Sequence, residues 1–133
     1  MPLSHVDENN QVKMVDVGHK GTTKREAIAE SRVWLPKAVL SLIQSDEIQS
    51  KKGPVFQTAI IAGIQGAKQT SALIPLCHPL SVNAINITIK IVEDEAVVRC
   101  SATIEGKTGV EMEALTGASV AALTIYDMCK ALT

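Results

Sequence analysis

The stretch from residue 106 to residue 130 constrains the fold of this chain most strongly. It is nearly all apolar, its length suits one long helix, and its charged side chains gather at the two ends. Glu111 and Glu113 fall in the expected first turn, and Asp127 and Lys130 fall in the last. This placement complements the helix dipole, which explains each charge taken alone. Glu113 and Lys130 are 17 residues apart, or about 25 Å along a helix. A small-molecule site that uses both ends therefore needs a second copy of the chain.

The composition indicates one globular domain, residues 1–133, with no highly charged partner. The apolar fraction is 46% and the net charge is −1, which argues against nucleic-acid or membrane binding. The three aromatic residues are too few for a base-stacking surface. The three cysteines form no CxxC pair, so a disulfide framework or a structural zinc site is not expected. Neither a signal-peptide core nor a membrane span is present in the sequence, and we expect a cytoplasmic protein.

Hydrophobic periodicity predicts an α+β fold. Strands are expected at 25–35, 82–92 and 96–104. Helices are expected at 36–45, 55–68 and 106–130. Residues 1–22 are expected to form an irregular arm and residues 50–54 a basic loop, while prolines keep 73–80 out of a regular helix. Gly63 and Gly66 are expected to mark close packing. This order of elements indicates helices on one face of an antiparallel sheet.

The most distinctive candidate site lies in the proline-stiffened loop 73–80. Pro79 biases His78 toward an extended backbone, so the imidazole has a fixed direction. It is a candidate for phosphate binding or proton transfer, and the alternative is a buried histidine bonded to the backbone. Cys77 and His78 are adjacent in an extended segment and point to opposite sides, which argues against a nucleophilic dyad.

A second candidate site consists of cations and one ion pair. Arg25, Lys51, Lys52 and Lys68 are either solvated surface charges or, together, a clamp for phosphate groups. The segment 106–109 lacks the upstream glycine of a phosphate-binding loop and is expected to be a turn and helix cap.

Asp127 and Lys130 share one face of the last helical turn. They form either an ordinary helix ion pair or a lysine acid/base aimed by a carboxylate.

Several strings of this sequence closely resemble one family. They are LIPLCHPL at 73–80, GKTGVEMEALT at 106–116, AALTIYDMCKA at 121–131, KREA at 24–27 and AGIQGAK at 62–68. The chain is identified by these strings as similar to the C protein of molybdenum-cofactor biosynthesis (MoaC), the cyclic pyranopterin monophosphate synthase family, from about Met14 to Ala131. The resemblance implies a lyase that converts 3′,8-cyclo-7,8-dihydro-GTP to cyclic pyranopterin monophosphate and releases pyrophosphate. It also implies a ferredoxin-like fold and a homo-oligomer, a hexamer of dimers, with its sites between subunits.

The resemblance assigns roles to ten residues of this chain. The catalytic residues are expected to be Asp127, Lys130 and Lys52. The substrate-binding residues are expected to be Leu76, Cys77, His78, Met112, Glu113, Arg25 and Lys68, with the last two as contacts to the triphosphate. No metal ligand or cofactor is implied, although Mg²⁺ with the triphosphate fits the same chemistry.

Family members usually continue with a strand and a Gly/Lys-rich tail, and we expect this chain to lack that tail. The alternative function is a non-catalytic guanine-nucleotide-binding or scaffold oligomer that has lost its activity with the tail.

Overall fold

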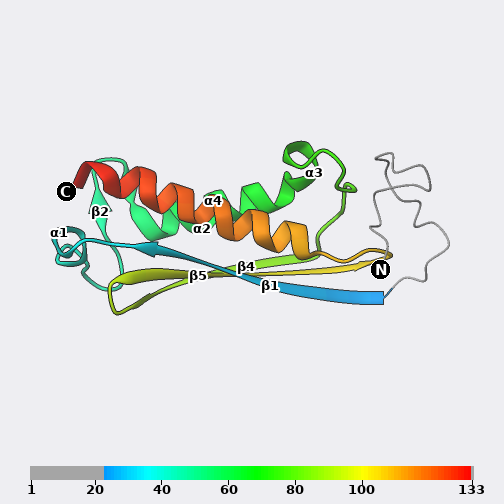
Figure 1. Cartoon of the computed structure of the whole chain (residues 1–133), viewed down its shortest axis with the longest axis horizontal. Helices are drawn as coiled ribbons and strands as arrows, with labels where there is room; N and C mark the ends of the chain where they lie inside the picture. Colours follow the sequence, from blue (N-terminus) through cyan, green and yellow to red (C-terminus); the bar gives the residue numbers. More distant parts are fainter. Residues whose placement is uncertain (1–22, 133) are drawn as a thin grey trace, which may run out of the picture.

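In the computed structural model, which describes residues 23–132, two long helices lie on one face of a three-stranded antiparallel sheet (Figure 1). The strands are β1 (Thr23–Trp34), β4 (Ala84–Val92) and β5 (Glu95–Gly106), in the order β1-β5-β4. The long helices are α2 (Val55–Lys68) and α4 (Glu111–Cys129). The short elements are α1 (Lys37–Leu40), α3 (Thr70–Leu73), the hairpin β2 (Gln49–Ser50) and β3 (Gly53–Pro54), and the 3₁₀ turn η1 (Lys130–Leu132). The predicted α+β fold with helices on one face is confirmed.

Alternation along the strands separates the core from the open face of the sheet. One set of alternate side chains in the three strands, which includes Ala29, Ile87 and Cys100, is buried under the helices. The neighbouring residues along each strand point to the opposite face of the sheet. The central strand β5 pairs with β1 from Thr23↔Gly106 to Trp34↔Glu95 and with β4 along the other edge. Because β1 and the end of β5 are paired up to Gly106, the chain enters α4 from a fixed position.

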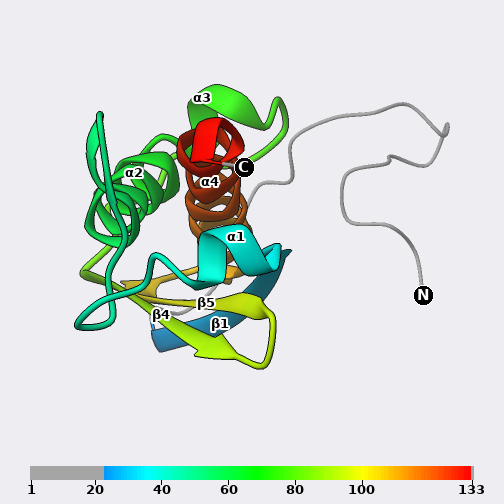
Figure 2. The same cartoon turned by 90° about the vertical axis from the view of Figure 1, so that its left-hand side faces the viewer.

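Glycines let α2 and α4 approach each other closely, as Figure 2 shows from one end. A Cβ atom on Gly63 would lie 2.8 Å from the carbonyl oxygen of Gly117 and 2.5 Å from Cδ1 of Ile87. Gly66 in turn faces Val120. The two helices run antiparallel, so the C-terminal end of α4 lies beside the start of α2. The predicted close packing at Gly63 and Gly66 is confirmed.

We expect Gly63→Ala to lower the free energy of unfolding by about 1.5 kcal/mol. The added methyl group meets a backbone oxygen that cannot move without shifting α4, and this overpacking exceeds the gain in helix propensity. Thermal denaturation measures the change. The matched control is Gly106→Ala, where the nearest side-chain atom would lie at 3.5 Å, and which should stay within about 0.5 kcal/mol of the wild type. Equal midpoints for both variants would contradict this account of the packing.

Two predicted helix boundaries are wrong. The helix expected at 36–45 ends at Leu40, and Ser45 and Asp46 both have positive φ, which turns the chain back toward α2. The helix expected at 106–130 begins at Glu111, because the preceding residues extend β5 as far as Gly106.

The other predicted elements agree with the structure. The strand predicted at 82–92 begins at Ala84, and the helix predicted at 55–68 is α2. The predicted basic loop is the tight turn of the β2–β3 hairpin. The predicted arm, 1–22, lies outside the described residues. No helix within residues 23–132 combines the length and apolar character needed to cross a membrane.

Candidate functional site

The C-terminal end of α4 carries a cluster of three charged side chains. Asp127 lies between two lysines, with Lys130 Nζ 3.0 Å from Oδ1 and Lys52 Nζ 3.4 Å from Oδ2. All three side chains are more than half exposed. The hydrogen bond from Lys130, and then that from Lys52, holds the pKa of the Asp127 carboxyl below its ordinary value. The same carboxylate raises the pKa of Lys130. The cluster therefore holds a protonated lysine at neutral pH.

Lys52 reaches this cluster because its hairpin is anchored to the start of α2. Glu47 accepts hydrogen bonds from the backbone N–H groups of Phe56 at 2.8 Å and Gln57 at 3.0 Å. The carboxylate thus satisfies donors of the first turn of α2, which no side chain at the N-cap position satisfies. The sequence analysis missed Glu47, because a carboxylate nine residues before the N–H group of Phe56 that it caps leaves no local pattern.

The N-terminal end of α4 carries a buried carboxylate. Glu113 is only 3% exposed, and the Sγ atom of Cys77 lies 3.8 Å from its Oε2. Burial raises the pKa of Glu113, and burial followed by the charge of Glu113 raises the pKa of the Cys77 thiol. Cys77 is therefore a protonated donor rather than a nucleophile.

The remaining predicted binding residues surround this second end. Leu76 and His78 flank Cys77 in the loop between α3 and β4, and both are half-buried. Met112 precedes Glu113 in the first turn of α4. The loop 76–78 therefore lies against the first turn of α4, where Cys77 contacts Glu113.

Two predicted cations lie on separate elements, Arg25 on β1 and Lys68 on α2. Arg25 pairs with Ile104 near the end of β5, and its Nε atom is buried without a hydrogen-bond partner among the described residues. Lys68 is exposed at the C-terminal end of α2. Within residues 23–132, no acceptor is therefore assigned to the Nε–H group of Arg25.

One copy of the chain does not bring all ten residues together. Lys52, Asp127 and Lys130 lie at one end of α4, and the Cys77–Glu113 contact lies at the other. Since α4 has 19 residues, the ends are separated by about 25 Å or more. Within residues 23–132, no three His, Cys, Asp or Glu side chains are grouped to hold a metal ion.

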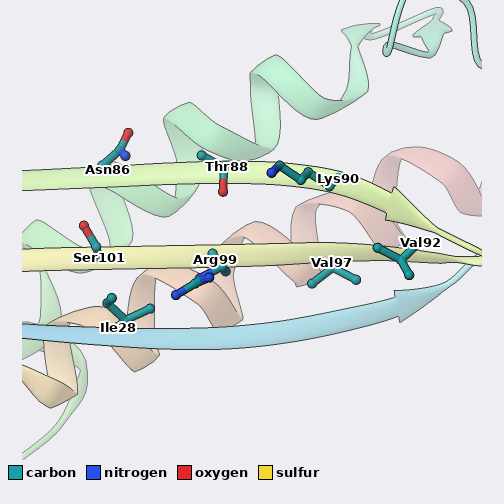
Figure 3. Close-up of a pocket in the computed structure, with 8 residues that line it drawn as sticks. All are labelled: Ile28, Asn86, Thr88, Lys90, Val92, Val97, Arg99 and Ser101. Carbon is teal, nitrogen blue, oxygen red and sulfur yellow. The ribbon is translucent and has the colours of Figure 1, made fainter.

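A separate hollow of about 400 Å³ lies on the sheet face opposite the helices (Figure 3). It is lined by Ile28, Asn86, Thr88, Lys90, Val92, Val97, Arg99 and Ser101. None of the ten predicted site residues lines this hollow.

Comparison with known proteins places the chain in a family. The model of the MoaC family matches residues 14–133. The chain belongs to the MoaC family. The match covers most of the chain, including both ends of α4 and the loop 76–78.

Individual MoaC relatives are similar along almost the whole chain. A cyclic pyranopterin monophosphate synthase of Xanthomonas axonopodis pv. citri is 49% identical over 132 residues, which are 98% of this chain and 80% of that protein. A protein of the same name from Helicobacter pylori is 50% identical over 134 residues, covering 99% of this chain and 84% of its own length. A molybdenum cofactor biosynthesis bifunctional protein of Synechocystis sp. is 49% identical, and the match covers 39% of it.

Proposed function

We propose that this chain is a cyclic pyranopterin monophosphate synthase, a lyase of molybdenum-cofactor biosynthesis. It converts 3′,8-cyclo-7,8-dihydro-GTP to cyclic pyranopterin monophosphate with release of pyrophosphate. The observation that carries the proposal is identity near one half, over nearly the whole chain, to proteins of that name. The paired Lys52, Asp127 and Lys130 supply the proton-transfer groups that such a rearrangement needs.

The charged cluster suits the proton transfers of ring opening and reclosure. Asp127 holds Lys130 in its ammonium form, so the resting site presents a proton donor. Lys52 bonds to the same carboxylate. In this proposal one lysine gives a proton to the substrate, and the other lysine takes a proton from it. Asp127 is the positioning anion that keeps both nitrogens in reach of a substrate.

The opposite end of α4 suits recognition of the substrate. The Glu113 carboxylate is an acceptor for N–H groups derived from guanine. Arg25 and Lys68 are the cations for the triphosphate, and preorganised cations stabilise the charge of departing pyrophosphate. Any Mg²⁺ enters with the triphosphate as part of the substrate, because we assign it no ligand from the protein.

The working unit in this proposal is a homo-oligomer in the cytoplasm, a hexamer of dimers as in the family. The separation of the two groups of residues along α4 supports a site shared between copies. Each copy contributes one end of α4 to each site.

Single-turnover conversion of the cyclised GTP intermediate tests the function. Pyrophosphate and pyranopterin are followed together, with enzyme in excess. Stoichiometric appearance of both is the expected result. Binding of the intermediate without either product would overturn the synthase assignment and favour a nucleotide-binding scaffold.

We expect Asp127→Asn to lower kcat/KM about tenfold and to shift its pH profile. Because Asp127 raises the pKa of Lys130, its neutralisation lets that pKa fall. A step that needs the ammonium form of Lys130 then begins to slow at a lower pH than in the wild type. The basic limb of the pH profile therefore shifts to lower pH. Initial rates across pH 6–10 measure the shift. The control is Asp94→Asn. Asp94 lies on the β4–β5 turn and accepts a hydrogen bond from Trp34 at the end of β1, so this substitution should leave the pH profile unchanged.

A further inference from the structure

The hairpin that carries Lys52 is closed at its base by one carboxylate. Glu47 precedes β2 and accepts a hydrogen bond from the backbone N–H group of Ile48 at 2.8 Å. Beyond the hairpin, in the first turn of α2, it accepts two more, from Phe56 at 2.8 Å and from Gln57 at 3.0 Å. The carboxylate therefore joins the two ends of the hairpin segment, and its negative charge suits the N-terminus of α2.

A second side chain holds the turn of the hairpin. Ser50 Oγ donates a hydrogen bond to the carbonyl oxygen of Gly53 at 2.8 Å and accepts one from the backbone N–H group of Lys52 at 3.2 Å. Gly53 has φ 112°, a conformation that side-chain-bearing residues rarely adopt. The β2–β3 ladder has only two residue pairs, and so short a hairpin is at most marginally stable alone. The backbone of Lys52 therefore depends on Glu47 and Ser50 for its position.

The side chain of Lys52 has little packing of its own. It is 65% exposed, and its Nζ atom lies 3.4 Å from Oδ2 of Asp127. An exposed ion pair contributes too little to hold a long side chain in one place, so the approach to Asp127 depends on the hairpin. Glu47 also lies near the end of α4, because burial and then the charge of Glu47 raise the pKa of the Cys129 thiol. The anchor of the hairpin is thus close to the helix end that carries Asp127.

We infer that Glu47 and Ser50 are positioning residues of the charged cluster, which keep the Lys52 ammonium group at Asp127 for the reaction. Neither residue touches the reacting atoms, and both act through Lys52. Their effect on turnover rests on the proposed function, whereas their hold on Lys52 rests on the hydrogen bonds of the hairpin. The competing explanation is that Glu47 only caps α2 and stabilises the fold.

Two observations favour positioning over stability alone. Ser50 bonds only within the hairpin and takes no part in capping α2, yet it holds the backbone N–H group of Lys52 itself. The neighbouring Lys51 is exposed on the same turn and forms no ion pair within the part of the chain that the structure describes. The hairpin therefore presents one of two adjacent lysines to Asp127, which is a selection that a helix cap alone does not require.

Competitive acetylation tests the hold on Lys52 without reference to activity. Trace labelling of the native protein, followed by peptide mass spectrometry, gives the rate at Lys52 relative to the rate at Lys51. Glu47→Ala should raise this ratio about threefold, because loss of an exposed ion pair frees the amine by that factor. Asp127→Asn removes the partner directly and should raise the ratio equally. An unchanged ratio in either variant would overturn the inference.

Ser50→Ala is a second variant, in which the cap of α2 stays intact. It should raise the Lys52 ratio about twofold while the thermal midpoint stays near that of the wild type. The control is Asp46→Asn, because Asp46 is exposed beside Glu47 with positive φ and asparagine tolerates that conformation. No rise in Ser50→Ala, or an equal rise in the control, would refute a specific hold on Lys52.

A double-mutant cycle tests whether Glu47 affects turnover only through Lys52. With the cyclised GTP intermediate as substrate, Glu47→Ala should lower kcat about tenfold and leave KM nearly unchanged. In a Lys52→Ala background the same substitution should cost less than about twofold. A tenfold loss in both backgrounds would mean that Glu47 acts on the fold, and the positioning role would be rejected. A wild type that makes no product, with the acetylation ratios as expected, would reject the proposed function and not the hold on Lys52.

Discussion

Lys130→Ala is expected to lower kcat/KM by about 10³-fold while the protein stays folded and assembled. Lys130 is more than half exposed and bonds Asp127 at 3.0 Å, so its removal leaves no cavity in the core. The loss should therefore appear in turnover and not in the thermal midpoint. Pyrophosphate release from the cyclised GTP intermediate, together with sedimentation, separates the two effects.

Lys130→Arg distinguishes proton transfer from charge alone. Arginine keeps the positive charge and the pairing with Asp127 but does not give up its proton. If Lys130 transfers a proton, this variant should stay nearly as inactive as the alanine variant. Lys37→Ala, an exposed lysine on α1, is the matched control and should keep full turnover. A rate within threefold of wild type for Lys130→Ala would remove this lysine from the mechanism.

The fold was largely predictable because its periodicities are strong. The alternation in β1 and β4 follows burial against two helices, and α2 begins and ends where its sequence pattern does. The errors arose where tertiary pairing overrides local preference. Gly106 extends β5 because β1 offers it a partner at Thr23, and no helical pattern in the sequence reveals that partner.

The site was predictable in part. The spacing of the charges on α4 predicted that its two ends are far apart, and the structure confirms the distance. Lys52 lies beside Asp127, which is 75 residues away in sequence. This position depends on a hairpin that Glu47 anchors to the start of α2. Such a contact follows from packing and was reached from sequence only through the family resemblance. The catalytic and binding roles of these residues stay predictions.

The location of Glu113 bears on both stability and turnover. Burial raises the pKa of this carboxyl, which means that the folded state favours its protonated form. Its contribution to stability is therefore fully present below the unfolded-state pKa, about 4.3, and is lost as pH rises through the higher folded-state pKa. At pH 7 burial destabilises the charged form of Glu113. A buried carboxyl group that lowers stability in this way is typical of a residue retained for function.

Glu113→Gln is accordingly expected to raise the free energy of unfolding at pH 7 by about 1 kcal/mol and to lower kcat/KM about 100-fold. The amide has the same shape and no charge, but it turns an N–H group toward substrate donors that the carboxylate accepts. Thermal denaturation at pH 7 and pH 4 measures the first effect, which should vanish at the lower pH. Glu111→Gln, in the same helical turn but exposed, loses its favourable position at the helix N-terminus without relief of burial, and should lose a few tenths of a kcal/mol. A destabilised Glu113→Gln with normal turnover would show that this carboxylate holds the helix end and does not act on substrate.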